Sequence, residues 1–82
     1  MSDQGFKVSD DSLSYYLSLK YLIEIYPEDR GFTVMIPDLP GCMSQGKTLD
    51  EAMMNIYKAK HLWLETVHAK NKALIPIPSI EQ

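Results

Sequence analysis

The chain has 82 residues, of which 45% are hydrophobic and 23% are charged, and its formal net charge is −3. This composition is typical of one small globular domain and excludes a disordered chain. The acidic balance disfavours nonspecific nucleic-acid binding, which draws its affinity from lysine and arginine on phosphates, and suits a basic protein partner better.

Cysteine content and hydropathy set further limits. The single cysteine, Cys42, cannot form an intrachain disulfide, which fits a reducing cytosol. No apolar run approaches the roughly 20 residues that a membrane span needs, and residues 1–5 lack the basic start of a signal peptide. We therefore expect one cytoplasmic domain over residues 1–82, with no membrane contact.

The N-terminal part of the chain is polar. Residues 1–9 are expected to be disordered. In residues 10–18 the apolar side chains have a helical spacing that Asp10 or Asp11 could cap, but they also alternate as in a strand. We favour a short helical turn.

Three strands are expected next, over residues 19–26, 32–36 and 42–45. In the first, every second residue from Leu19 to Ile25 is apolar, as in a strand with one buried face. Leu22 and Tyr26 make its other face partly apolar as well, so we expect something to cover that face. The spacing predicts a three-stranded antiparallel meander.

The segments between these strands have the composition of tight turns. Residues 27–31 combine proline, acidic side chains and glycine, the usual chemistry of a hairpin. Pro37 and Pro40 fix φ and remove two backbone donors, and Gly41 permits a turn conformation that other residues avoid. Residues 36–41 are therefore expected to form a rigid corner.

One long helix is predicted from Leu49 to about Lys70. Thr48 and Glu51 form a Thr-x-x-Glu capping box at its start. An apolar stripe at steps of three and four is expected to cover the sheet: Leu49, Ala52, Met53, Ile56, Ala59, Trp63 and Val67. Further apolar residues broaden this sector and indicate a homo-oligomer or partner interface: Met54, Tyr57, Leu62 and Leu64.

The last segment, residues 75–79, contains two prolines at alternate positions. Pro76 and Pro78 lack N–H groups that would point to the same side of a strand, whereas the other side can still pair. This predicts a short C-terminal edge strand. The expected fold class is α+β: a three-stranded antiparallel meander with one long helix packed across it and a short C-terminal edge strand.

The order of these elements, together with local motifs, resembles the HicB family, the antitoxin half of HicA–HicB toxin–antitoxin systems. The motifs are Tyr15-Tyr16-Leu17-Ser18-Leu19, Ile36-Pro37-Asp38-Leu39-Pro40-Gly41-Cys42, Gln45-Gly46 with Thr48 and Glu51-Ala52, Leu62-Trp63-Leu64-Glu65 and Ile75-Pro76-Ile77-Pro78-Ser79. The resemblance implies a partial ribonuclease-H-like fold that has lost its catalysis. It also implies binding and inhibition of a small basic HicA-like toxin that cleaves mRNA.

The sequence departs from that family at two places. Many members have a C-terminal DNA-binding module, whereas this sequence stops soon after Ser79, so no direct DNA binding is expected from this chain alone. Lys47 stands where an acidic residue is often found before the helix cap. The chain thus resembles a short, stand-alone member, which we expect to form a homo-oligomer (dimer or tetramer).

Residues that could support other chemistry have simpler interpretations. Four carboxylates are the nearby candidates for a two-metal nuclease site: Glu24, Asp38, Asp50 and Glu51. Asp50 and Glu51 are instead explained as residues of the helix start. His61 and His68 are seven apart, not the four of a His-x-x-x-His zinc site, and Cys42 is interpreted as a small buried apolar group. The lysines are interpreted as a solvated helix face: Lys58, Lys60, Lys70 and Lys72.

We therefore predict a non-enzymatic antitoxin, without metal or cofactor, that occludes the active surface of a toxin. The expected contacts lie in the acidic hairpin turn and in the corner: Glu28, Asp29, Asp38, Leu39, Pro40 and Gly41. Two alternatives stand beside it. One is an orphan oligomeric regulatory domain without a toxin partner, and the other is a residual metal-dependent ribonuclease.

Overall fold

The structure, a computed structural model, describes residues 12–79, so the predictions for residues 1–9 and for capping by Asp10 or Asp11 lie outside it. Its elements in chain order are α1 (Leu13–Ser18), β1 (Glu24–Glu28), β2 (Gly31–Met35), β3 (Met43–Gly46), α2 (Leu49–Asn71) and the 3-10 turn η2 (Lys72–Leu74). The strands form one antiparallel sheet in the order β1-β2-β3. The predicted α+β class, the meander and the long helix are confirmed.

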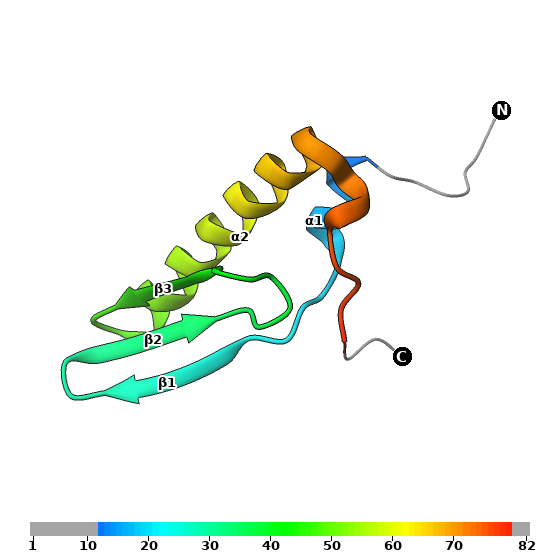
Figure 1. The fold of residues 1–82 in the computed structure, drawn as a ribbon. Helices are drawn as coiled ribbons and strands as arrows, with labels where there is room; N and C mark the ends of the chain where they lie inside the picture. The colour runs from blue at the N-terminus through cyan, green and yellow to red at the C-terminus, as the bar shows by residue number, and fades with distance from the viewer. Residues whose placement is uncertain (1–11, 80–82) are drawn as a thin grey trace, which may run out of the picture.

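The sheet and α2 form two layers (Figure 1). Within residues 12–79, α2 is the one helix that packs on the sheet, and it covers β2 and β3 on a single face. At the other end of α2, α1 lies beside it, with the Tyr16 ring edge-on to His68 at a centroid distance of 5.7 Å. The second face of the sheet is left without a covering element in this part of the chain.

The short helix α1 confirms the helical interpretation of the ambiguous N-terminal pattern. Its cap is Ser12, whose side-chain oxygen accepts a hydrogen bond from the backbone N–H of Tyr15. This cap satisfies one of the N–H groups that a helix start leaves without a partner.

The hairpin between β1 and β2 is tighter than predicted. Glu28 pairs with Gly31, so Pro27 and Glu28 belong to β1 and the turn has only the two residues Asp29 and Arg30. The first strand also begins later than predicted, at Glu24 and not at residue 19. The reason is the length of its neighbour, because β2 ends at Met35 and leaves residues 19–23 without a strand to pair with.

The predicted cap of α2 is confirmed, with one difference. The Thr48 hydroxyl accepts from the backbone N–H of Glu51 at 3.1 Å, as in a capping box. The Glu51 carboxylate, however, accepts from the backbone N–H of Lys47 at 2.7 Å, one residue before the usual donor. Glu51 therefore holds the short connection from β3 as well as the start of the helix.

Gly46 allows α2 to begin very close to β3. A Cβ atom at this position would overlap the backbone nitrogen of Ala52, which is fully buried. Glycine is the residue that permits such close approach of two backbones. The contact brings the first turn of α2 onto the end of the sheet.

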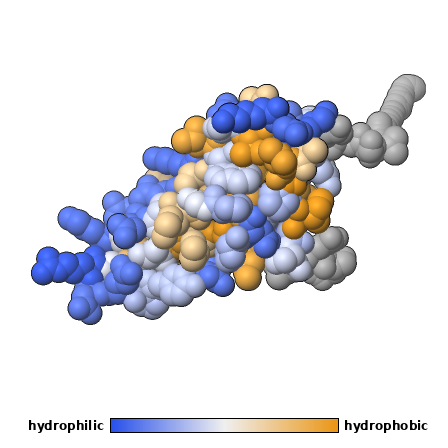
Figure 2. Space-filling view, in the orientation of Figure 1, coloured by the Kyte–Doolittle hydropathy of each residue, from blue (hydrophilic) through white to orange (hydrophobic). Residues whose placement is uncertain are grey.

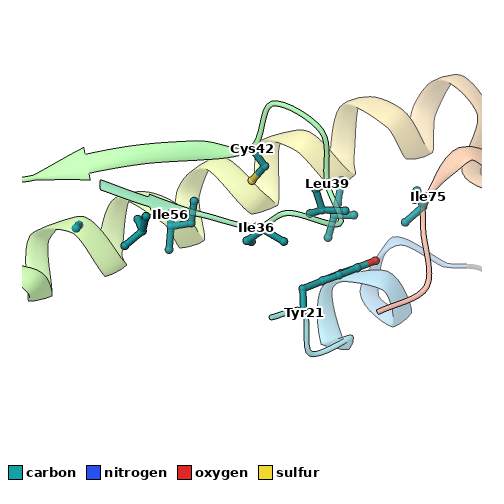
Figure 3. Packing of buried hydrophobic residues seen from close by; sticks show 9 residues of the cluster. Tyr21, Ile36, Leu39, Cys42, Ile56 and Ile75 are labelled. Carbon is teal, nitrogen blue, oxygen red and sulfur yellow. The ribbon is translucent and has the colours of Figure 1, made fainter. Parts of the chain in front are cut away.

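The core lies between α2 and one face of the sheet and continues toward α1 (Figure 3). Its largest fully buried side chains are Val34, Ile36, Leu39, Ile56 and Leu64. Two predictions need correction here. Leu64 belongs to the core and not to the surplus apolar surface, whereas Leu49, predicted to lie in the core stripe, is exposed because it lies at the very start of the helix.

The predicted C-terminal edge strand is wrong, since residues 75–79 form no strand. η2 turns the chain after α2, and the segment then crosses the end of the sheet, where Ile75 is buried. The Tyr21 hydroxyl donates to the carbonyl of Pro76 at 2.6 Å. Because residues 19–23, which lie beside this segment, are not a strand, they offer it no edge to pair with.

Candidate protein-binding surface

No element within residues 12–79 covers the face of the sheet opposite α2. Side chains alternate between the two faces of a strand, and Val34 points into the core under α2. Its neighbours along β2 and their cross-strand partners therefore form the other face, which we call the open face: Glu24, Tyr26, Glu28, Thr33, Met35, Met43 and Gln45.

A stripe of alternating acidic and aromatic side chains runs along β1 on the open face. Glu24, Tyr26 and Glu28 share this face, and Tyr26 has 46% of its surface exposed. The Tyr26 hydroxyl donates to Oε1 of Glu24 at 2.5 Å, and this hydrogen bond raises the pKa of Tyr26. The stripe thus combines an aromatic ring, held in place by its hydrogen bond to Glu24, with negatively charged side chains.

The rest of the open face is neutral and partly apolar. Met43 is half exposed, Met35 is partly exposed, and the buried Thr33 accepts a long hydrogen bond of 3.5 Å from Gln45. The amino-acid pattern indicated this surface, because Leu22 and Tyr26 make the second face of the first strand partly apolar. The prediction that something covers this face is wrong for residues 12–79, because α2, the helix that packs on the sheet in this part of the chain, lies on the opposite face.

The two halves of the predicted contact site lie apart. Glu28 and Asp29 are at the hairpin end of β2, and the corner with Asp38 is beyond its other end (Figure 1). Five residues of β2 separate them, or about 17 Å at the rise of a strand. Figure 2 shows hydrophilic side chains gathered at the hairpin end and apolar ones toward α1 and η2.

The corner is a compact turn anchored to α2. Leu39 donates its N–H to the carbonyl of Ile36 and accepts from the N–H of Cys42, at 3.0 and 2.9 Å. Gly41 has a φ of 81°, the left-handed conformation that favours glycine. Trp63 Nε1 donates to the carbonyl of Pro40 at 2.8 Å, which ties the turn to the helix.

Exposure differs among the predicted corner residues. Pro40 and Gly41 are exposed and Asp38 is partly exposed, whereas Leu39 is fully buried. In this conformation the Leu39 side chain supports the corner from inside and offers no surface to a partner. The Asp38 carboxylate accepts the backbone N–H of Ser79 at 2.8 Å, so it holds the C-terminal segment across the corner.

Polar groups beneath the corner are partly desolvated. Burial, with a smaller contribution from the negative charge of Asp38, raises the pKa of Tyr21 to about 12. Burial also raises the pKa of the Cys42 thiol and lowers the pKa of Lys60. These shifts describe structural groups, because Tyr21 and Lys60 bond to backbone carbonyls of this chain.

Lys60 corrects the interpretation of the helix lysines. Its Nζ donates to the carbonyl of Leu19 at 3.1 Å and lies 5.6 Å from the centroid of the Tyr21 ring. It therefore fastens the segment before β1 to α2 and is not part of a solvated face. Cys42 is buried, as predicted for a small apolar group.

The candidate nuclease carboxylates do not converge in the described chain. Each of three carboxylates bonds to a different part of the chain. Glu24 accepts from the hydroxyl of Tyr26, Asp38 accepts from the N–H of Ser79, and Glu51 accepts from the N–H of Lys47. Among residues 12–79, no group of three histidine, cysteine, aspartate or glutamate side chains could hold a metal ion. His61 lies 3.9 Å from Glu65 on the surface of α2.

No helix in residues 12–79 combines the length and apolar character that crossing a bilayer requires.

Comparisons with known proteins agree on one family. Residues 21–82 match the family described as HicB-like antitoxin of bacterial toxin–antitoxin systems. A UPF0150 protein of Synechocystis sp. is 44% identical over 64 residues, which cover 77% of this chain and 84% of that protein. A UPF0150 protein of Thermoplasma acidophilum is 37% identical over 57 residues, covering 68% of this chain and 83% of that protein.

A longer relative also matches. An uncharacterised 14.9 kDa protein of Haemophilus phage HP1 is 39% identical over 62 residues, which cover 76% of this chain but 47% of the phage protein. No solved structure shows significant similarity, so the likeness to ribonuclease H stays a prediction. The family match spans most of the chain, and this protein belongs to the HicB-like antitoxins of bacterial toxin–antitoxin systems.

Proposed function

We propose that this protein binds a small basic toxin of the HicA type through the open face of its sheet, and that binding blocks RNA cleavage by the toxin. Membership of the antitoxin family supports a toxin as the partner. The observation that carries the choice of surface is the stripe of Glu24, Tyr26 and Glu28 along β1. In this proposal the protein inhibits by occlusion and is not itself an enzyme.

The chemistry of the stripe fits a basic protein. Tyrosine and methionine are enriched at protein interfaces, because they offer large contact areas with one polar group or none. Acidic side chains around them accelerate association with a basic partner and select against acidic ones. Since Tyr26 is exposed beside Glu24, it is the natural anchor, and Asp29 extends the negative charge to the tip of the hairpin.

The corner is a secondary contact in this proposal. Asp38, Pro40 and Gly41 lie beyond the other end of β2, so a partner that spans the open face reaches both ends of the sheet. Because Asp38 already accepts the N–H of Ser79, its charge is partly satisfied within the chain. We therefore expect the hairpin end to contribute more to binding than the corner does. We also place the action in the cytoplasm, where a toxin of this type meets mRNA.

Inhibition of RNA cleavage tests the proposal directly. The product of the neighbouring reading frame is purified and mixed with RNA, and this protein is then added at increasing concentration. The expected result is loss of cleavage at a stoichiometric ratio. Glu24→Lys with Glu28→Lys should raise the concentration needed at least about tenfold, a loss of about 1.4 kcal/mol of binding free energy. Unchanged inhibition by this double variant would contradict the choice of surface.

A pair of tyrosines provides a matched control for the aromatic anchor. Tyr26 and Tyr57 are similarly exposed, but Tyr57 lies on α2, away from the open face. Tyr26→Ala should weaken inhibition, whereas Tyr57→Ala should leave it unchanged.

Two outcomes would favour the alternative functions. If the product of the neighbouring reading frame does not bind this protein and does not cleave RNA, the orphan regulatory domain becomes the better account. RNA cleavage by this protein alone with Mg²⁺ or Mn²⁺, abolished in Asp38→Asn, would instead favour the residual nuclease.

A further inference from the structure

The outer edge of β3 is open and uncharged. β3 pairs with β2 on one side, and no strand within residues 12–79 lies on its other side. Its four residues, Met43 to Gly46, include neither a charged residue nor a proline. Sheets usually protect such an edge with charge, proline or a covering segment, because its free backbone groups can pair with another strand.

The hydrogen-bond pattern identifies which backbone groups face this edge. Ile36 donates its N–H to the carbonyl of Cys42 at 3.0 Å, which places these two residues at a hydrogen-bonded position of the ladder, although the Cys42 N–H donates to Leu39. Such positions alternate along an antiparallel ladder, and Met43 and Gln45 therefore turn their N–H and C=O groups away from β2. The Gln45 carbonyl accepts from Asn55 Nδ2 at 2.7 Å. Met43 is left with both groups directed at the open edge.

The opposite edge of the sheet is protected. By the same alternation, Ile25 and Pro27 are the residues of β1 that face outward. Pro27 has no N–H to donate, and its neighbours include the charged Glu28. The two edges of one small sheet are thus unequal, and the β3 edge, which has neither proline nor charge, is better prepared for another strand.

An apolar groove lies beside the open edge on the side of α2. It has a volume of about 370 Å³, and its lining includes Gly41, Cys42, Ala59, Trp63 and Val67. Leu62 also lines this groove, yet 64% of its surface is exposed. Since Cys42 directly precedes Met43, the groove and the free backbone groups lie next to each other.

We propose that the β3 edge and this groove join two copies of the chain about a two-fold axis at Met43. Each Met43 then donates its N–H to the Met43 carbonyl of the other copy, and the two sheets form one six-stranded antiparallel sheet. Such a contact is self-complementary, as a two-fold interface requires. The two α2 helices run antiparallel on the same side of this sheet, and Leu62 of each copy packs at the groove of the other.

Charge favours a second copy as the occupant of this edge. The chain carries a net charge of −3, but the strip along β3 is neutral, so the two copies meet without repulsion there. Lys58 and Glu65 lie four residues before and three residues after Leu62. An axis near Leu62 therefore brings Lys58 of one copy toward Glu65 of the other.

The interface does not depend on the proposed function. The stripe on β1 lies at the far edge of each sheet, so both open faces stay available to a toxin after pairing. The experiment accordingly uses the full chain alone, without a toxin. A failure of pairing and a failure of toxin inhibition are then separate results.

The mass of the full-length protein in solution, from sedimentation equilibrium, tests the pairing. The parent should have twice its chain mass of 9.4 kDa. Met43→Pro removes an outward N–H and should raise the dimer dissociation constant at least about tenfold. Ile25→Pro, the matched change on the β1 edge, should leave it unchanged. Circular dichroism confirms that each variant is folded.

A second pair of variants keeps the test decisive if the proline change disrupts the fold. Leu62→Lys should separate the copies, whereas Met54→Lys, at an equally exposed position of α2, should not. A parent with the mass of a single chain at high micromolar concentration overturns the proposal. So does a parent dimer or tetramer whose mass neither Met43→Pro nor Leu62→Lys reduces.

Discussion

At the corner end of the sheet, where residues 37–41, α1 and residues 75–79 meet, hydrogen bonds join residues that are far apart in the sequence. Lys60 bonds to Leu19, Tyr21 to Pro76, Trp63 to Pro40 and Asp38 to Ser79, each over more than 20 positions.

Toward the hairpin end, the side-chain hydrogen bonds join residues that are closer in the sequence. Tyr26 bonds to Glu24, and Glu51 bonds to Lys47 and Thr48, over at most four positions. The bonds of Gln45 to Thr33 and to Asn55 span 12 and 10 positions. The side chains of β1 there remain exposed. The comparison indicates a division of roles, in which the corner end stabilises the fold and the hairpin end is left free to bind.

The largest effect on stability is expected from the core near the corner end. Leu64→Ala removes a fully buried side chain and should lower the free energy of unfolding by about 2–5 kcal/mol. Met54→Ala, on the exposed side of the same helix, should change it by less than about 0.5 kcal/mol. Urea denaturation measures both. Similar losses for the two variants would mean that α2 packs through a different face.

The substitution Gly46→Ala tests whether close backbone packing also stabilises the part of the fold near the hairpin end. Gly46→Ala places a methyl group against the backbone of Ala52 and should cost about 1–3 kcal/mol, since two backbones must separate. Gly41→Ala meets no atom within 4 Å, so its cost is limited to the strain of a positive φ, about 1–2 kcal/mol. Thermal or urea unfolding compares the two. A Gly46→Ala protein as stable as the parent would contradict the close approach of α2 and β3.

Tyr21 gives the corner end a measurable dependence on pH. Its pKa is about 12 in the folded protein against 10.0 ordinarily, so the unfolded chain loses this proton first as pH rises. The stabilisation is complete below pH 10 and is lost progressively toward pH 12. Tyr21→Phe should lose about 1 kcal/mol at neutral pH with the bond to Pro76, and should fall less steeply between pH 10 and 12. Parallel pH profiles for parent and variant would contradict this role.

The smallest effect on stability is expected at the hairpin end. Tyr26→Ala should change the free energy of unfolding by less than about 0.5 kcal/mol, because the ring is exposed and bonds only to its neighbour Glu24. The same variant is expected to weaken toxin inhibition. A large loss of stability in urea unfolding would show that Tyr26 supports the fold. It would contradict the assignment of stability to the corner end and binding to the hairpin end.

The accuracy of the sequence-based predictions follows the same division between local and distant contacts. Thr48 and Gly41 were interpreted correctly because a helix cap and a tight turn depend on a few adjacent residues. The start of β1 and the edge strand at residues 75–79 were wrong, since both depend on which segment lies alongside. Leu64 and Lys60 were misplaced because their burial depends on segments far away in the sequence: the rest of the core cluster for Leu64, and residues 19–21 for Lys60.

The predicted contact site shows the same limit. Its acidic residues were recognised by type, but the sequence could not show that Asp29 and Asp38 lie beyond opposite ends of β2. Nor could it show that Leu39 is buried. For the stripe on β1, the alternation placed Tyr26 on the second face of the strand, whereas Glu28 was assigned to the turn, and only the sheet topology brings these residues together on an uncovered face.

Methionine methyl groups offer the most direct test of the open face as the toxin-binding surface. Met35 and Met43 lie on that face, whereas Met53 and Met54 lie on α2. In NMR spectra of protein with labelled methionine methyls, adding the neighbouring toxin should shift the resonances of Met35 and Met43 and leave those of Met53 and Met54 in place. Shifts confined to Met53 and Met54 would contradict the proposed surface.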